Sequence, residues 1–147
     1  MAKFGEIEKF LKREGINFKV INLPAAAVSV EDVIRLSGGQ IKEEEIIKTL
    51  IGKNKDGEFM AFILRGRDRL KPGAVERLAT REEVAKIAGV EVGAVCPILI
   101  GITVVIDKKV RQLKRVNMGS GDHLKGLEMD FGDLLKVLPA HRIEEIT

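Results

Sequence analysis

One lysine, Lys48, lies inside the apolar run from Ile46 to Ile51. A run of this length, rich in isoleucine, predicts a buried or half-buried strand. In such a strand an ammonium group is costly unless an anion or a set of carbonyl oxygens meets it. The partner is a structural carboxylate or a bound substrate whose carbonyl or phosphate Lys48 holds, and both alternatives stay open. Thr49 points to the opposite face of a regular strand and ranks below Lys48.

Two glycine-bearing loops are the next candidates for chemistry. Gly93-Ala94-Val95-Cys96-Pro97 joins a residue free to take positive φ to a proline that fixes a turn. The N–H groups between them could point outward together toward an oxyanion or a carbonyl, although an ordinary tight connection is favoured from these five residues alone. Gly119-Ser120-Gly121-Asp122-His123 matches neither the P-loop nor the dinucleotide fingerprint. A plain turn is favoured there too, with His123 a candidate polar group for a pocket.

Cysteine and histidine give little sign of nucleophilic or metal chemistry. Cys96 is the single cysteine, so no internal disulfide forms, in agreement with a reducing compartment. No histidine is near it in sequence, so an inert, small apolar side chain is favoured over a nucleophile. Cys96, His123 and His141 are isolated from one another and show none of the usual zinc spacings. We therefore expect no metal site.

Length and composition favour one compact domain over residues 1–147, with 45% hydrophobic and 32% charged residues. No stretch approaches the roughly 20 apolar residues of a membrane span, and the first residues lack a signal-peptide apolar core. We expect a cytoplasmic protein without a membrane partner. The net charge of +3 permits a polyanionic partner. With no Trp or Tyr, any nucleic-acid binding would depend on shape and backbone contacts.

Each charged segment of the chain is either ordinary solvated surface or a set of functional contacts. The acidic stretch Glu43–Glu45 is predicted to be a solvent-facing turn, although one of its carboxylates could be the structural partner of Lys48. Most basic runs are solvated surface, whereas contacts to nucleic-acid phosphates are the alternative. Two basic clusters are candidates for such contacts: Arg65, Arg67 and Arg69, and Lys108, Lys109 and Arg111.

Periodicity and capping signals predict the elements that position these residues. Ser29 and Asp32 predict the start of a helix through Leu36, and Thr80 caps a second helix that Gly89 ends. The Lys48 strand and residues 59–64 predict an antiparallel hairpin. Further helices are predicted at 4–14 and around 134–137, and further strands at 18–21, 102–106, 113–117, 126–131 and 142–146. This order predicts an α+β fold: a mixed, mostly antiparallel sheet, curled or barrel-like, surrounded by helices.

Taken in order, several of these segments resemble the YbaK/ProX family. They are Ile47-Lys48-Thr49-Leu50, the Gly93 to Pro97 loop, the strand ending at Asp107, and the glycines 119 and 121 before Leu127-Glu128-Met129. The family consists of aminoacyl-tRNA deacylases related to the editing domain inserted in bacterial prolyl-tRNA synthetases. The resemblance covers roughly residues 3–138. Ala94, Cys96 and Ile98 stand where many relatives carry glycine, serine and phenylalanine, a difference that bears on amino-acid specificity.

The resemblance implies hydrolysis in trans of the ester of mischarged aminoacyl-tRNA, with alanyl-, cysteinyl- or seryl-tRNA, especially tRNA for proline, as the first substrates to test. It makes Lys48 the anchor for the substrate's carbonyl or terminal phosphate, and the Gly93–Pro97 backbone the holder of the aminoacyl group. A hydroxyl of the substrate's terminal ribose would help to activate water, so the pocket needs few acids or bases and no cofactor. Secondary substrate contacts are expected from Thr49, Gly119, Ser120, Gly121 and His123.

The resemblance also bears on partners. Aminoacyl-tRNA is the expected partner, with the basic clusters on its acceptor-stem phosphates, and an aminoacyl-tRNA synthetase is a candidate second partner. Two other classes of function remain open: a non-catalytic tRNA- or RNA-binding module, and a small-ligand-binding regulatory domain of the same fold. Replacement of Lys48 separates catalysis from RNA binding, and a salt titration separates RNA binding from a small-ligand pocket.

Overall fold

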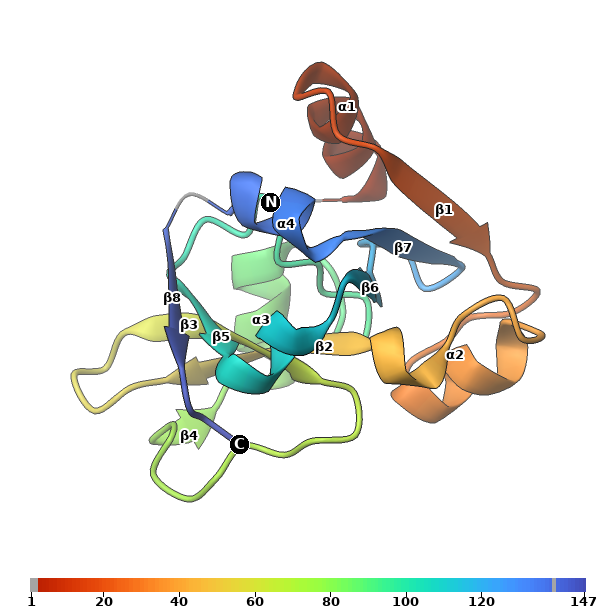
Figure 1. Ribbon diagram of the computed structural model, residues 1–147. Helices are drawn as coiled ribbons and strands as arrows, with labels where there is room; N and C mark the ends of the chain where they lie inside the picture. Colours follow the sequence, from red (N-terminus) through yellow and green to blue (C-terminus); the bar gives the residue numbers. More distant parts are fainter. Residues whose placement is uncertain (1–2, 139) are drawn as a thin grey trace.

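The computed structural model describes residues 3–138 and 140–147 (Figure 1). Helices and strands are interspersed along these residues. In chain order they are α1 (Phe4–Arg13), β1 (Phe18–Asn22), α2 (Val30–Leu36), the 3₁₀ helix η1 (Glu43–Glu45), β2 (Ile47–Lys53), β3 (Phe59–Arg65), β4 (Arg77–Leu78), α3 (Arg81–Ala88), β5 (Val104–Asp107), the 3₁₀ helix η2 (Lys108–Gln112), β6 (Arg115–Gly119), β7 (Lys125–Asp130), α4 (Phe131–Lys136) and β8 (His141–Glu144).

The predicted helix starts are confirmed by their caps. The Ser29 hydroxyl accepts the Asp32 N–H at 3.1 Å, and the Asp32 carboxylate accepts the Val28 N–H at 3.0 Å. The start of α2 therefore also fixes the backbone just before it. Thr80 and Glu83 form a reciprocal capping box at the start of α3, which ends at Gly89 with φ 73°.

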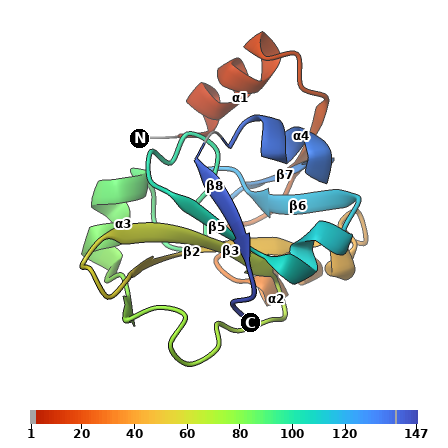
Figure 2. The same ribbon diagram turned by 60° about the vertical axis from the view of Figure 1, so that its left-hand side comes forward.

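The strands form two sheets, as Figures 1 and 2 show. The three-stranded sheet has the order β1-β7-β6 and is antiparallel throughout. The five-stranded sheet has the order β4-β2-β3-β5-β8, with β3–β5 and β5–β8 parallel. In the described part of the chain, one isolated bridge, between Ile46 and Asn117, joins the two sheets. The prediction of a mixed, mostly antiparallel α+β fold is confirmed, and the sheet does not close into a barrel.

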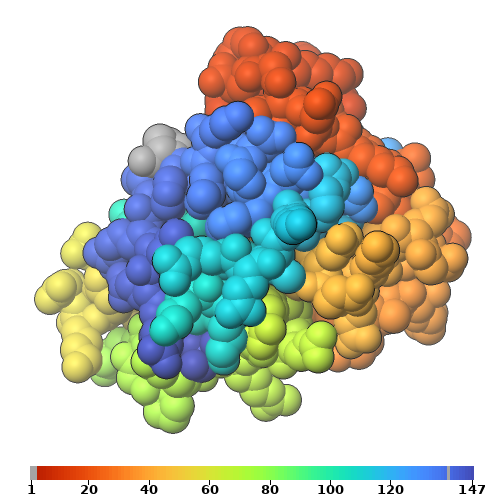
Figure 3. Space-filling model, in the orientation of Figure 1, coloured from red at the N-terminus to blue at the C-terminus, as the bar shows by residue number. Residues whose placement is uncertain are grey.

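The main hydrophobic core lies between the two sheets. Ile47 and Ile63 contribute from the five-stranded sheet, and Val116 and Leu127 contribute from the three-stranded sheet. Ile7 and Leu11 of α1, which projects at the top of the molecule in Figure 3, are fully buried in the same core. The other face of the five-stranded sheet is covered by the chain that follows β3, including Leu70, Ala74 and Val75.

The first half of β2 has an open edge. β4 pairs with β2 only at Gly52 and Lys53, on the side away from β3. In the described part of the chain, no other strand continues this edge toward the start of β2, apart from the Ile46–Asn117 bridge. Unpaired backbone groups of an edge strand are available to other partners. The residues from Ile47 to Leu50 therefore border a space that the sheet itself does not fill.

Some element boundaries differ from the predictions. The last strand begins at His141 and ends at Glu144, because the Ile146 N–H donates to the Asp107 carboxylate at 3.0 Å instead of continuing the ladder. The acidic stretch, predicted as a solvent-facing turn, is the short helix η1, and the Glu45 side chain accepts a hydrogen bond from Asn117. None of the helices within residues 3–138 and 140–147 has the length and apolar character needed to span a bilayer.

Candidate functional site

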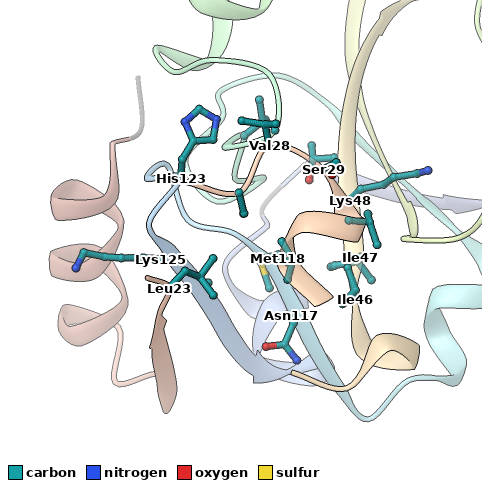
Figure 4. Close-up of a pocket in the computed structure, with 18 of the residues that line it drawn as sticks. Leu23, Val28, Ser29, Ile46, Ile47, Lys48, Asn117, Met118, His123 and Lys125 are labelled. Atoms are coloured by element: carbon teal, nitrogen blue, oxygen red, sulfur yellow. The ribbon is translucent and has the colours of Figure 1, made fainter. Parts of the chain in front are cut away.

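A cavity of about 200 Å³ lies along the open edge of β2 (Figure 4). We call it the edge cavity. The fold brings its walls together from parts of the chain that are far apart in sequence. The lining residues are Leu23, 27–30, Val33, Ile41, 46–50, Val92, Gly93, Val95, 117–119, Asp122, His123, Lys125 and Gly126. Most of the walls are apolar, and the polar side chains enter from the strand edge and from the loops. Such an apolar pocket with a few convergent polar groups is typical of a small-molecule site.

Lys48 lies on the outer face of β2. It pairs with Leu64 across the hairpin, so both side chains leave the same face of the sheet. Figure 4 shows the Lys48 side chain extending away from His123, toward the side of the β3–β4 loop. Burial lowers the pKa of Lys48 from its usual 10.5, and the Arg69 guanidinium lowers it further, whereas Asp68 and Glu31 oppose the shift.

The structural-partner alternative for Lys48 has little support in this geometry. Among residues 3–138 and 140–147, no carboxylate forms an ion pair with Lys48, and Asp68 is engaged by Arg65 at 2.7 Å. Glu45, the nearest of the three acidic residues to β2 in sequence, accepts the Asn117 amide at 3.3 Å. The ammonium group therefore keeps capacity for an external anion or carbonyl oxygen.

Thr49 lies on the other face of the same strand and still lines the edge cavity. Its neighbours two residues away, Ile47 and Ile51, are 2% and 4% exposed and belong to the main core. The Thr49 hydroxyl oxygen is buried and has no hydrogen-bond partner among the described residues. Consecutive residues of β2 thus reach the cavity from opposite faces, because the cavity follows the edge of the strand.

Glycines let three loops approach one another closely. Gly93 has φ +96°, and a Cβ added to it would lie 2.7 Å from the Val28 carbonyl oxygen. A Cβ added to Gly119 would lie 2.6 Å from the Val95 carbonyl oxygen. The Gly121 N–H then donates to the Ala94 carbonyl at 2.8 Å. The two glycine loops singled out in the sequence are therefore in direct contact.

Some of the predicted loop residues line the cavity and others do not. Gly93, Val95, Gly119 and His123 line the edge cavity together with Lys48 and Thr49. Five others do not: Ala94, Cys96, Pro97, Ser120 and Gly121.

Among these five, Ser120 and Cys96 are buried, and neither the hydroxyl nor the thiol is available to react. The Ser120 hydroxyl is bound to the Lys125 carbonyl at 2.7 Å. Cys96 is 3% exposed, and burial raises the pKa of its thiol to about 12. A thiolate is therefore suppressed at neutral pH, in line with the inert interpretation from the sequence.

His123 lies at one end of the cavity, apart from Lys48 in Figure 4. Its Nε2 atom is 3.3 Å from the Val92 carbonyl oxygen, and its own carbonyl accepts the Ala27 N–H at 2.9 Å. Asp122 accepts the Leu124 N–H at 2.8 Å. Both side chains are thus engaged in holding loops together. Within the described residues, no group of three His, Cys, Asp or Glu side chains is placed to hold a metal ion.

Sequence reasoning missed several cavity residues. Asn117 is 2% exposed and its Oδ1 atom has no partner among the described residues, while its amide nitrogen donates to Glu45. The available signal was a polar residue at the end of the apolar strand predicted at 113–117. Val28 also lines the cavity, but nothing in the local sequence before the α2 cap indicates that its backbone meets Gly93.

The two basic clusters differ in what their side chains already contact. Arg65 is paired with Asp68 at 2.7 Å, and Lys109 donates to the Thr147 hydroxyl at 3.0 Å. Lys108 makes a long contact of 3.9 Å with Glu145. The remaining three residues of the clusters, Arg67, Arg69 and Arg111, are exposed.

Comparisons with known proteins identify the family of this chain. A family model described as aminoacyl-tRNA editing domain matches residues 25–137. Among curated proteins, the proline–tRNA ligase of Caldicellulosiruptor bescii is 32% identical over 116 residues, which are 70% of this chain and 20% of the ligase. The chain thus spans about a fifth of the length of such relatives.

Solved structures share the fold over nearly the whole chain. The crystal structure of a hypothetical protein, 26% identical, has a TM-score of 0.80 and covers 95% of this chain and 97% of its own. A structure described as a candidate trans-editing enzyme for prolyl tRNA synthetase, 20% identical, has a TM-score of 0.80 and covers 100% of this chain and 98% of its own. The match to the family model spans most of the chain and includes every residue that lines the edge cavity except Leu23. The chain belongs to the aminoacyl-tRNA editing domain family.

Proposed function

We propose that this chain acts in trans to hydrolyse the ester that joins a wrong amino acid to tRNA. One observation carries the proposal: in a chain of the editing-domain family, a single cavity gathers Lys48, Gly93 and His123 from segments far apart in sequence. Its volume of about 200 Å³ suits a small aminoacyl group, and its lining includes a lysine with no ion pair among the described residues. A cation and backbone dipoles are the groups that ester hydrolysis needs around a developing oxyanion.

In this proposal Lys48 anchors the carbonyl or the terminal phosphate of the substrate. The Gly93 loop holds the aminoacyl group, and a ribose hydroxyl of the substrate helps to activate water. Asp122 and His123 line the cavity but are engaged in loop contacts, which fits a site that takes its general base from the substrate. Positioning and electrostatic stabilisation would then supply most of the rate enhancement.

Mischarged tRNA for proline is the leading substrate. The curated relatives that support this choice are proline–tRNA ligases at 32% identity, and a structural neighbour is described as a candidate trans-editing enzyme for prolyl tRNA synthetase. Arg67, Arg69 and Arg111 are exposed and available for acceptor-stem phosphates. A synthetase is the second partner that we propose to test, by co-purification in the presence of tRNA.

The test is release of the amino acid from alanyl-, cysteinyl- and seryl-tRNA. Wild type is compared with Lys48→Ala and with Lys55→Ala, which removes an exposed lysine in the β2–β3 turn. We expect rapid release by wild type and Lys55→Ala, and a loss of about a hundredfold or more in Lys48→Ala, the scale for removal of one oxyanion-stabilising group. Thermal unfolding of each variant verifies folding.

Other outcomes contradict the proposal. Release at the spontaneous rate from every aminoacyl-tRNA, together with salt-sensitive tRNA binding, would establish a non-catalytic RNA-binding module. Weak tRNA binding at every ionic strength would point to a small-ligand domain. If Lys48→Ala releases amino acid as fast as wild type, Lys48 is not the anchor, and if it unfolds the protein, Lys48 has a structural role.

A further inference from the structure

We propose that three exposed apolar side chains at one end of the edge cavity, those of Val28, Val92 and Leu124, bind the terminal adenine base of the substrate tRNA. We call them the apolar rim. The proposal rests on the proposed deacylase function and assigns a contact for the terminal nucleoside outside the cavity. Val28 is 58% exposed, Val92 48% and Leu124 47%. Six large hydrophobic side chains in the described part of the chain are exposed, and half of them belong to this rim.

The rim comes from three segments that backbone contacts tie together. The Val28 carbonyl oxygen lies 2.7 Å from the Cβ position of Gly93, the residue after Val92. The Val92 carbonyl oxygen is 3.3 Å from Nε2 of His123, the residue before Leu124. Val28 and Val92 also line the edge cavity, and Figure 4 shows Val28 at the end where His123 lies. The rim therefore continues the cavity wall outward, and an exposed apolar patch in such a place is typical of a binding surface.

The two ends of the cavity differ in charge. Figure 4 shows Lys48 extending away from His123, and the positive charge of Arg69 acts on Lys48 at that end. The rim end carries carboxylates instead. Glu91 directly precedes Val92 and is exposed, and Asp122 accepts the Leu124 N–H at 2.8 Å. A phosphate is therefore favoured at the Lys48 end and disfavoured at the rim, where a neutral base meets no such repulsion.

Lys125 also lines the cavity but directs its charge elsewhere. Its Nζ atom donates to the Asn22 Oδ1 atom at 3.2 Å and lies 5.4 Å from the centre of the Phe4 ring. Figure 4 shows the Lys125 side chain pointing away from the cavity. The rim therefore stays apolar, with no cation from this neighbour turned toward it.

The covalent structure of the substrate fits these two ends. One ribose carries the aminoacyl ester, the terminal phosphate and the adenine base. With the acyl group in the cavity and the phosphate at the Lys48 end, the base is the part that remains for the opposite end. Unstacked bases at single-stranded ends bind on aromatic or apolar side chains. The chain has no Trp or Tyr, so at this end the aliphatic rim takes that place.

The experiment measures binding of two probes by calorimetry. One is 3′-alanylamino-3′-deoxyadenosine, whose amide replaces the ester, and the other is the same compound with hydrogen in place of the base. We expect wild type to bind the adenosine probe about tenfold more tightly than the base-free probe, the scale of one stacked base. Val92→Ser/Leu124→Ser should remove most of this preference. Leu78→Ser/Ile143→Ser, which changes two exposed apolar residues that do not line the edge cavity, is the matched control and should keep it.

Thermal unfolding verifies that both double variants fold, as expected for changes at exposed positions. Equal affinity of wild type for the two probes, no measurable binding of the adenosine probe, or a preference that Val92→Ser/Leu124→Ser leaves unchanged overturns the assignment. A rim variant that loses co-purification with a synthetase but keeps the adenine preference overturns it too, in favour of a protein contact. If wild type releases no amino acid but shows a rim-dependent adenine preference, the proposed hydrolysis fails and the rim assignment stands.

Discussion

The carbonyl oxygen of Val28 lies 2.7 Å from the position that a Cβ atom on Gly93 would occupy. Gly93 also has φ +96°, a conformation that L side chains rarely adopt. The loop after α3 therefore reaches the segment before α2 only because residue 93 is glycine. This contact closes one side of the edge cavity, so a change at Gly93 alters both stability and the site.

Gly93→Ala is expected to destabilise the protein by about 1–3 kcal/mol and to slow amino-acid release. Two costs combine: the strain of a positive φ in alanine and the clash of its Cβ with the Val28 carbonyl oxygen. The matched control is Gly101→Ala, which has φ +79° but open space around its Cβ position. That variant should lose about 1 kcal/mol and keep its release rate. Urea denaturation and kcat/KM measure the two effects. Equal losses in both variants would show that strain alone matters and that the Val28 contact does not.

The lowered pKa of Lys48 predicts a pH dependence with a defined sign. Burial and then Arg69 shift this pKa downward from 10.5, so the folded protein loses the Lys48 proton at lower pH than an unfolded chain does. Release that needs the cation should fall as pH rises through the lowered pKa. Arg69→Ala should move this fall to higher pH, because one of the lowering charges is gone. NMR titration of labelled lysine side chains measures the shift, and a titration midpoint that stays in place contradicts the coupling.

The Cys96 thiol is predicted to be inert. With its pKa raised to about 12 by burial, it should resist alkylation at pH 8 in the folded protein and react at once in denaturant. Cys96→Ala should retain release within about twofold, and its cost should be confined to stability, on the order of 1 kcal/mol for a small core truncation. Mass spectrometry after iodoacetamide treatment follows the reaction. Loss of release on alkylation of the native protein would reopen a role for the thiol.

Local rules were sufficient to predict most of the elements. The Ser29–Asp32 and Thr80–Glu83 spacings identified two helix starts because capping depends on residues three apart. The apolar runs on both sides of the polar 52–57 turn identified the β2–β3 hairpin, because strand and turn residue types are also local signals. The predicted end of the last strand was wrong because a long-range hydrogen bond competes with strand pairing. The Ile146 N–H donates to the Asp107 carboxylate.

The cavity was only partly predictable from the sequence. Lys48 stood out because a charge in an apolar strand is unusual, and Gly93 because glycine before proline marks a turn. The depth of a loop residue is set by what packs on it, so no local pattern distinguishes buried Ser120 from His123 on the cavity wall. Thr49 was ranked below Lys48 because the two side chains leave opposite faces of the strand, and both residues line the cavity because it follows the edge of that strand.

Glu83 predicts an acid-sensitive contribution to stability away from the cavity. Arg77 binds its carboxylate through two hydrogen bonds of 2.7 and 2.9 Å, and the Thr80 N–H adds a third at 2.9 Å. These bonds hold the pKa of Glu83 at about 2, against its usual 4.5. Because the folded pKa is the lower one, the contribution is fully present above about pH 4.5 and is lost as pH falls toward 2.

Glu83→Gln tests this contribution, because glutamine can still accept the capping bond but does not titrate. The difference in unfolding free energy between wild type and Glu83→Gln should be constant above about pH 5 and shrink steadily between pH 4.5 and 2. Glu82→Gln, which removes an exposed neighbouring carboxylate that takes no part in the Arg77 bonds, is the matched control. Urea denaturation across this pH range provides the measurement. A wild-type to Glu83→Gln difference that does not change with pH would mean that the Arg77 pair contributes nothing, as is common for exposed ion pairs.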